Sequence, residues 1–351
     1  MKLIHCADVH LGSQMDAHLP RTKVAERRAE IRNTFLRMVE LAKSEGIGHI
    51  LLSGDVFDSD RPIKRDKDLF YNIIKGSPEI CFYYLRGNHD LGEDYRAEQL
   101  PNLKLFSDSW RSYDAGEVVI SGIELTEGNA DSLYATLSLD RSRRNIVMLH
   151  GQISDSRGAG LICLPALRDK GIDYLALGHL HSYSSGALDQ RGTYAYSGCL
   201  EGRGFDECGS KGFVILDTDG GRISHFHKPF ATRCIRDLCV DISGCDGAYS
   251  VLGVIRRAEF SASDILHVRL VGEVAFDPLG LEDQLAGMLE PYCYFARVKN
   301  RARRALDLSK IEQESSLKGE FLRVVLRSNL SEDEKSEVIN LGLAALFGNE
   351  I

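Results

Sequence analysis

The sequence predicts an α/β fold with a parallel sheet at its core, and three observations lead to this expectation. Short apolar runs of strand length alternate with segments that have helical spacing of apolar residues. Several of these runs end in glycine, aspartate, asparagine or histidine. The chain has 351 residues, more than one ordinary domain, and its pattern restarts near Thr232. We therefore expect two parts or more, with chemistry at the carboxyl ends of the first part's strands.

The elements of the first part follow from this periodicity. Strands are expected at residues 2–6, 47–52, 80–85, 118–123, 145–149, 172–177, 194–197, 212–216 and 222–226. Helices are expected at residues 24–44, 64–75, 130–137 and 161–168. The strands at 194–197 and 212–216 are expected to be antiparallel, and a turn at 217–221 joins the second of them to the next strand in a hairpin.

A second β-α-β-α-β run follows at residues 235–242, 248–257, 265–271, 279–289 and 292–298. It predicts a small separate domain. The tail, residues 317–347, is typical of two amphipathic helices, and Ser331 with Glu334 is a capping-box signature for the second helix.

Composition excludes several classes of protein. Hydrophobic residues make up 43% of the chain and charged residues 27%, which is ordinary for a soluble protein with a core. No apolar run approaches the ~20 residues that span a membrane, so we expect no membrane association. The nine cysteines are scattered without a C-x-x-C pair, which argues against a disulfide scaffold and favours reduced thiols in the cytoplasm.

Potential metal ligands follow the buried strands. Asp8 and His10 lie two apart, so in an extended backbone their side chains point to the same face. The complete group that follows strands is Asp8, His10, Asp55, Asn88, His89, His150, His179 and His181. Mixed nitrogen and oxygen ligands suit Mn²⁺, Fe²⁺ or Zn²⁺. Even seven of these eight residues would be too many ligands for one ion with an open position, and they suit two ions that clamp a phosphoryl group.

The ordered motifs D-x-H, G-D-x-x-D, G-N-H-D, H and G-H-x-H resemble those of the calcineurin-like metallophosphoesterases, over about residues 1–230. The resemblance implies a two-sheet sandwich flanked by helices and a centre of two divalent ions, most commonly Mn²⁺. It implies that the first ion is held by Asp8, His10 and His181. The second ion would be held by Asn88, His150 and His179, with Asp55 bridging both. His89 would act on the leaving oxygen, and the carboxylate of Asp58 would orient His89.

Within this family, the segment from Tyr196 to Glu207 is similar to one in the bacterial SbcD-type DNA repair exonucleases and their YhaO-like group, with Cys199 in place of the usual serine. This resemblance implies a DNA exonuclease or endonuclease that acts in double-strand-break or end repair. It also implies a nuclease domain at residues 1–230, a DNA-capping α+β domain at 231–306 and a helical docking segment at 307–351. The expected partners are DNA, an SbcC-like coiled-coil ABC-type ATPase and a second copy of the chain.

Alternative interpretations remain open at this point. The net charge of −8 requires any nucleic-acid contact to be local, and the basic run near residue 300 is either such a contact or a solvated surface. That run contains Arg297, Lys299, Arg301, Arg303 and Arg304. A phosphatase or a small-nucleotide phosphodiesterase could use the same metal centre. A non-catalytic scaffold is a further alternative, although such proteins usually lose ligands. The tail helices could also pack on each other or on their own domain.

Overall fold

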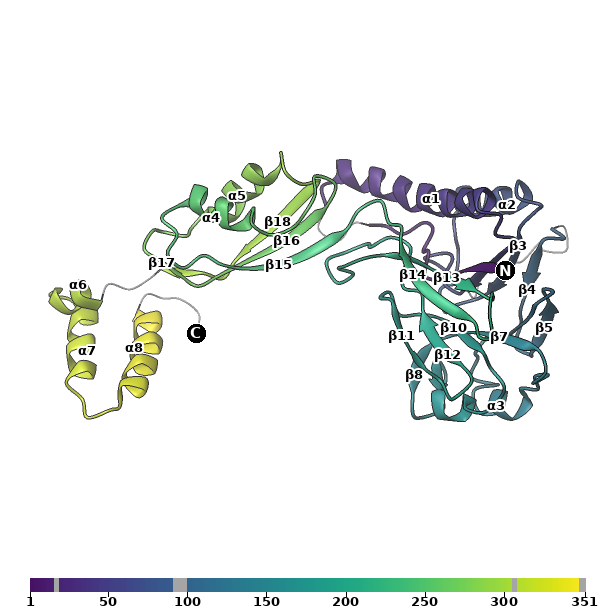
Figure 1. The fold of residues 1–351 in the computed structure, drawn as a ribbon. Helices are drawn as coiled ribbons and strands as arrows, with labels where there is room; N and C mark the ends of the chain where they lie inside the picture. Colours follow the sequence, from purple (N-terminus) through teal and green to yellow (C-terminus); the bar gives the residue numbers. More distant parts are fainter. Residues whose placement is uncertain (16–18, 91–99, 305–307, 347–351) are drawn as a thin grey trace. The chain divides into compact units, whose positions relative to one another are not determined.

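The computed structural model describes the chain except for residues 16–18, 91–99, 305–307 and 347–351 (Figure 1). The chain divides into two compact units. The first unit is Met1–Asp237 with Ser261–Leu266, and the second is Leu238–Phe260 with His267–Ile351. The predicted division at residues 230 and 306 stays a prediction. Residues 307 and 347, where the docking segment begins and the last helix was expected to end, lie outside the described residues.

Two six-stranded sheets form the first unit. The first sheet has the order β14-β13-β1-β2-β3-β4, with bounds β14 Ser224–Pro229, β13 Gly212–Asp217, β1 Lys2–Cys6, β2 His49–Ser53, β3 Cys81–Leu85 and β4 Leu103–Leu105. Strands β1 to β4 run parallel, whereas β13 is antiparallel to both β1 and β14. The hairpin predicted around residues 217–221 is therefore present between β13 and β14.

The second sheet has the order β11-β12-β10-β7-β6-β5, with bounds β11 Ser184–Ala187, β12 Thr193–Tyr196, β10 Tyr174–Gly178, β7 Arg144–His150, β6 Val118–Gly122 and β5 Arg111–Asp114. Its four central strands are parallel, and β11 and β5 are antiparallel at the edges. The expectation that residues 194–197 form an antiparallel strand is thus only half right, because β12 pairs in parallel with β10. The parallel core is present, but it is divided between two sheets.

Side-chain alternation along the strands explains why the sheets pack face to face. Leu3 and Leu51 of the first sheet share one buried cluster with Ile146 and Met148 of the second. The residues next to them along each strand point to the opposite face, as the period of two requires. On that outer face of the first sheet, Ile50 packs with residues of helices α1 (Arg21–Ser44) and α2 (Lys64–Lys75). The result is a two-sheet sandwich flanked by helices, as predicted.

The outer face of the second sheet is covered by shorter elements. Val147 and Leu175 pack there with residues of α3 (Leu133–Thr136) and of a 3₁₀-helix at Leu164–Leu167. The predicted helix at 161–168 is wrong in its first half. Residues Leu161–Cys163 form strand β9, which pairs in parallel with β8 (Gln152–Ser154). Pro165 has no main-chain N–H, so a helix can begin at this point but cannot run through it.

Most of a three-stranded sheet in the order β15-β16-β18 belongs to the second unit, with bounds β15 Ile235–Asp241, β16 Ile265–Val271 and β18 Phe295–Asn300; the starts of β15 and β16 belong to the first. Helices α4 (Ala248–Ile255) and α5 (Leu281–Leu289) alternate with these strands, as predicted. A two-stranded pair, β17 (Glu273–Val274) and β19 (Arg303–Arg304), adds to it.

Three helices follow, namely α6 (Leu308–Gln313), α7 (Leu317–Leu326) and α8 (Glu332–Leu346), of which the first was not predicted. The predicted capping box is present, because Ser331 N donates to Glu334 Oε2 at 2.8 Å and Glu334 N donates to Ser331 Oγ at 3.3 Å. Ile311, Leu322, Val325 and Ile339 form a small buried cluster between these helices. Within the described part of the chain, none of the helices has the length and apolar composition that crossing a membrane requires.

Candidate metal centre

The predicted ligands lie where parallel strands of the two sheets end. Asp8 and His10 follow β1, Asp55 follows β2, and Asn88 follows β3. In the second sheet, His150 ends β7, and His179 and His181 follow β10. Because strands of one sheet contact strands of the other, for example β2 with β10 and with β7, these ends meet at a common edge of the sandwich. The direction of the strands alone thus brings together residues that lie up to 173 positions apart in the sequence.

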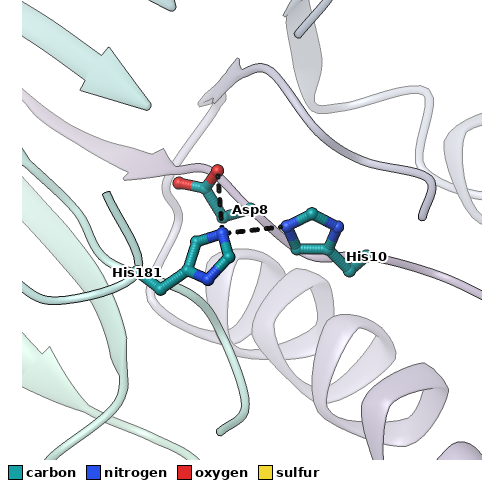
Figure 2. A group of neighbouring side chains, drawn as sticks. All are labelled: Asp8, His10 and His181. Carbon is teal, nitrogen blue, oxygen red and sulfur yellow. Dashed lines mark hydrogen bonds and ion pairs between the residues drawn. The ribbon is translucent and has the colours of Figure 1, made fainter. Parts of the chain in front are cut away.

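One cluster consists of Asp8, His10 and His181, whose potential ligand atoms lie within 4.8 Å of one another (Figure 2). The Nε2 atoms of His10 and His181 are 3.2 Å apart, and Asp8 Oδ1 is 3.9 Å from Nε2 of His181. Asp8 and His10 are fully buried, whereas His181 is partly exposed. This is the residue set that the family resemblance implies for the first ion.

A second cluster lies beside it and shares Asp8. The potential ligand atoms of Asp8, Asp55 and His150 also lie within 4.8 Å of one another. Nε2 of His150 is 3.4 Å from Asp55 Oδ2 and 3.1 Å from Asn88 Oδ1. Nδ1 of His179 is 3.3 Å from the same oxygen of Asn88. The structure therefore brings together all seven residues for which the resemblance implies a ligand role.

The backbone at these positions adopts an uncommon conformation. Asp8, His10 and Asp55 have φ between 51° and 52°, and His179 has φ of 108°. Among the described residues, only two other non-glycine residues, Met15 and Asp169, have positive φ. Left-handed backbone is unfavourable for residues with a side chain, and it persists where the surrounding structure enforces it, typically at functional sites. The strain is concentrated on the predicted ligands.

Two glycines are required by the close approach of the strand ends. A Cβ on Gly54, which has φ of 96°, would lie 2.1 Å from Nδ1 of His150. A Cβ on Gly87 would lie 2.1 Å from Oδ1 of Asp55. Gly87 is not among the glycines with positive φ, so it is needed for room beside the Asp55 carboxylate and not for a left-handed turn. Because each of these glycines has no side chain, it leaves room for a ligand side chain from another motif.

Electrostatics in this cluster are set by burial and by opposed charges. Burial lowers the pKa of His150, but its hydrogen bond and charge interaction with Asp55 outweigh burial and raise that pKa to about 9. Burial raises the pKa of Asp55, but His150 outweighs it and the pKa of Asp55 falls below its usual range. Burial also lowers the pKa values of His10 and His179. The cluster therefore holds a positive charge next to Asp55, and a divalent cation would compete with that proton.

Ring orientation shows that the residues fit a metal ion. Nδ1 of His150 is 2.9 Å from the main-chain oxygen of Ser53, which can only accept, so Nδ1 donates a proton to it. Nε2 faces the oxygens of Asn88 and Asp55, and once its proton has left, its lone pair is directed toward them. A carbonyl or carboxylate partner on the far nitrogen is the usual support for a ligating histidine. Electron pairs that converge at these distances need a cation between them, and a first-row divalent ion would take the place of the Nε2 proton.

The contacts of His89 and Asp58 differ from the implied arrangement. The carboxylate of Asp58 does not orient His89 by a direct hydrogen bond; its Oδ1 lies 3.0 Å from Nδ1 of His10. His89 is held instead by main-chain groups. Its Nδ1 is 3.1 Å from the main-chain oxygen of Asp58, and its own main-chain N donates to Asp55 Oδ1 at 2.9 Å. Potential ligand atoms of His10, Asp58 and His89 still lie within 4.8 Å of one another.

Sequence reasoning assigned no role to three further residues at this site. Asp90 is fully buried and accepts from the main-chain N–H groups of Val56, Phe57 and Gly87, so it ties the ends of β2 and β3 together. Glu207 Oε1 lies 2.7 Å from Nδ1 of His181, and Arg203 pairs with Glu207. Asp90 belongs to the G-N-H-D motif, and Arg203 and Glu207 belong to the segment that carries the nuclease resemblance.

The predicted DNA-binding residues lie in the second unit, on β18, β19 and the link between them. Arg297 and Lys299 are half-buried and alternate along β18 with the buried Ala296 and Val298. Arg301, Arg303 and Arg304 are exposed. These five residues form a run along the edge strand β18 and the short strand β19 of the two-stranded pair, and they belong to a different unit from the metal ligands.

Comparisons with known proteins agree with this geometry. Residues 1–183, more than half of the chain, match the model of the calcineurin-like phosphoesterase family. The uncharacterized metallophosphoesterase YhaO of Bacillus subtilis is 30% identical over 246 residues, which cover 64% of this chain and 59% of YhaO. The DNA double-strand break repair protein Mre11 of Sulfolobus acidocaldarius is 24% identical over 300 residues, which cover 78% of this chain and 76% of that protein.

Among solved structures, a dimetal phosphatase from Danio rerio matches with a TM-score of 0.45 and 11% identity, over 64% of this chain and 95% of that protein. The match of the family model, together with the ligand clusters at the strand ends, identifies the enzyme class. The chain belongs to the calcineurin-like phosphoesterase family, the members of which are phosphoester hydrolases that typically bind two divalent metal ions.

Proposed function

We propose that this chain is a metal-dependent nuclease that hydrolyses phosphodiester bonds of DNA during double-strand-break or end repair. One observation carries the proposal. The similarity to the Mre11 repair protein covers 78% of the chain, which is more than the first unit contains, so it extends beyond the metal centre into the second unit. A likeness confined to the ligand motifs would fit any phosphoesterase of the family.

The residues of the centre have separable tasks in this reaction. Asp8, His10 and His181 would hold one ion and Asn88, His150 and His179 the other; the resemblance implies that Asp55, whose potential ligand atoms cluster with those of Asp8 and His150, would contact both. When bound, two such ions activate a water and neutralise charge on the phosphoryl oxygens. Mn²⁺ fits the mixed donor set, as do Fe²⁺ and Zn²⁺.

His89 is placed to move a proton. The main-chain oxygen of Asp58 can only accept, so Nδ1 of His89 carries a proton, and Nε2 on the other side of the ring is available to a substrate. When Nε2 is also protonated, it can donate to the leaving oxygen as that bond breaks. The hydrogen bond from the main chain of His89 to Asp55 fixes this side chain relative to the predicted bridging ligand.

The proposal extends to the second unit and to partners. The basic run from Arg297 to Arg304 would contact the DNA backbone, since an acidic protein must concentrate positive charge to bind a polyanion. The helices after residue 307 would dock on an SbcC-like coiled-coil ABC-type ATPase, in an assembly built on a dimer of this chain. We place the protein in the cytoplasm, where its nine free cysteines would stay reduced.

The test is a substrate comparison with Mn²⁺ present. End-labelled linear duplex DNA, bis-p-nitrophenyl phosphate and the monoester p-nitrophenyl phosphate are incubated with the purified chain. We expect cleavage of DNA and of the diester, with little turnover of the monoester. An Asp55→Asn variant serves as the control for contaminating nuclease. Rapid monoester hydrolysis with intact DNA would contradict the proposal and support a phosphatase instead.

A further inference from the structure

Arg203 connects two carboxylates at the metal centre. Its Nη1 donates to Asp58 Oδ1 at 2.6 Å, and its Nη2 donates to Glu207 Oε1 at 2.8 Å. The main-chain N of Arg203 also donates to Glu207, to Oε2 at 2.7 Å. The arginine side chain is 19% exposed and the glutamate 5%, so both contacts are largely shielded from solvent. One guanidinium thus fixes two acidic side chains that come from different parts of the chain.

Each of these carboxylates lies beside the far nitrogen of a different histidine. Glu207 Oε1 is 2.7 Å from Nδ1 of His181 in a hydrogen bond, and because a carboxylate can only accept, this Nδ1 is protonated and Nε2 of His181 carries the lone pair. Asp58 Oδ1 lies 3.0 Å from Nδ1 of His10 without hydrogen-bond geometry, so Asp58 places a negative charge beside the His10 ring. These two Nε2 atoms face each other at 3.2 Å beside Asp8 (Figure 2).

Nδ1 of His181 has a second neighbour, because Nη2 of Arg203 lies 3.1 Å from it. Nη2 could donate to Nδ1 only if Nδ1 carried no proton. The contact between Nδ1 of His181 and Glu207 is shorter, at 2.7 Å, which indicates that Nδ1 carries the proton. Both oxygens of Glu207 accept from Arg203, Oε2 from its main-chain N at 2.7 Å and Oε1 from its Nη2 at 2.8 Å, so the carboxylate is surrounded by N–H donors.

The other ligand cluster has no such connection among the described residues. Nδ1 of His150 is held by the main-chain oxygen of Ser53, which no side-chain substitution removes. In the described part of the chain, Arg203 makes no hydrogen bond or ion pair with Asn88, His150 or His179. The support of the two clusters is thus asymmetric.

We propose that Arg203 is a positioning residue that sets the affinity of one metal position, the one formed by Asp8, His10 and His181, and leaves the other position unaffected. Without the guanidinium, the two carboxylates that it joins repel each other, so Glu207 is less able to orient the ring of His181 and Asp58 is no longer fixed beside His10. Arginine suits this task because its planar fork can donate to two carboxylates at once, whereas lysine offers a single charged nitrogen. The proposal rests on the metal centre of the proposed function but not on DNA as the substrate.

The experiment measures metal binding directly. Chain stripped of metal is titrated with Mn²⁺, and free Mn²⁺ is followed by electron paramagnetic resonance, for the parent, Arg203→Gln and Arg203→Lys. Arg191→Gln is the matched control, because Arg191 makes a two-point pair with Asp173 at the opposite end of β10. We expect Arg203→Gln to weaken one of two binding events about 10- to 100-fold, the usual effect of removing support from a ligand. Arg203→Lys should recover part of this loss.

Three outcomes would overturn the proposal: equal weakening of both events, no change in either, or the same change in Arg191→Gln. Thermal unfolding in EDTA shows whether each variant still folds. If Arg203→Gln does not fold, Arg203→Lys decides, and parent-like affinity at both positions would then refute the role. The result is independent of DNA cleavage, so a chain that leaves DNA intact would refute the nuclease proposal and not this one.

Discussion

Replacing Arg27 is expected to reveal the cost of an unpaired buried charge. The Arg27 side chain on α1 and the Glu201 side chain are both 0% exposed, and they pair at 3.3 Å. Arg27 also pairs with Glu30 and donates to the main-chain oxygen of Gly202 at 2.7 Å. Arg27→Met keeps most of the length of the side chain and removes the charge, so Glu201 remains buried without its cation.

The expected loss in the free energy of unfolding is about 3 kcal/mol, the lower end of the ~3–5 kcal/mol for breaking a buried pair. The lower end applies because Thr34 Oγ1 still donates to Glu201 at 2.7 Å, and the main-chain N of Thr232 also donates to it. Arg143→Met is the matched control, since Arg143 pairs with Asp114 on the surface, where the side chains are 35% and 65% exposed. That pair should contribute little to stability, because solvent screens it.

Urea unfolding followed by tryptophan fluorescence is suited to this comparison. The chain has one tryptophan, Trp110, which lies in the first unit and donates from its indole N–H to the main-chain oxygen of Leu133 at 2.9 Å. The signal therefore reports the unit that contains both arginines and is insensitive to separate unfolding of the second unit. Equal losses in the two variants would refute the reasoning, because they would mean that water or other donors replace Arg27 at Glu201.

Four further predictions concern function. Asp55→Ala should remove or cripple both metal positions, and metal analysis that finds two ions per chain would exclude a bridging role. His89→Ser should lower turnover on the order of 10²–10⁴-fold while metal content is kept; a variant that loses metal would make His89 a ligand. The exposed arginines of the basic run are Arg301, Arg303 and Arg304. Replacing them with glutamine should weaken DNA binding and lower the slope of log affinity against log salt concentration by about one unit per lost phosphate contact, and an unchanged slope would leave the run a solvated surface. Removing residues 317–351 should abolish co-purification with the ATPase and preserve diester hydrolysis, whereas an insoluble or metal-free product would assign these helices to the core.

The elements that periodicity predicts well are those whose own residues create the pattern. Helix α2 has the predicted bounds of Lys64–Lys75, because its buried residues recur at helical spacing. Strand β1 has the predicted bounds of Lys2–Cys6; all of its residues after Lys2 are buried, and they alternate between the two buried faces of the first sheet. The edge strand β11 was missed because Ser184–Ala187 is short, small and mostly exposed, with no apolar alternation. It is a strand only because β12 offers hydrogen-bonding groups beside it. The formation of such a strand depends on the neighbouring strand and cannot be predicted from its own residues.

The candidate metal centre likewise has some features that the motifs predict and others that depend on distant residues. Where each ligand lies follows from strand direction, since residues just past the ends of adjacent parallel strands must be close together. Which atom each ligand faces depends on side-chain rotamers and on partners that lie far away in the sequence. Asp58 illustrates this, because its main-chain oxygen contacts His89 while its carboxylate contacts His10 and Arg203. A motif that places Asp58 three residues after Asp55 fixes the first contact but leaves the second to Arg203, 145 residues further along the chain. The ligands of such a centre can therefore be read from ordered motifs, whereas the groups that orient them have to be found in the folded chain.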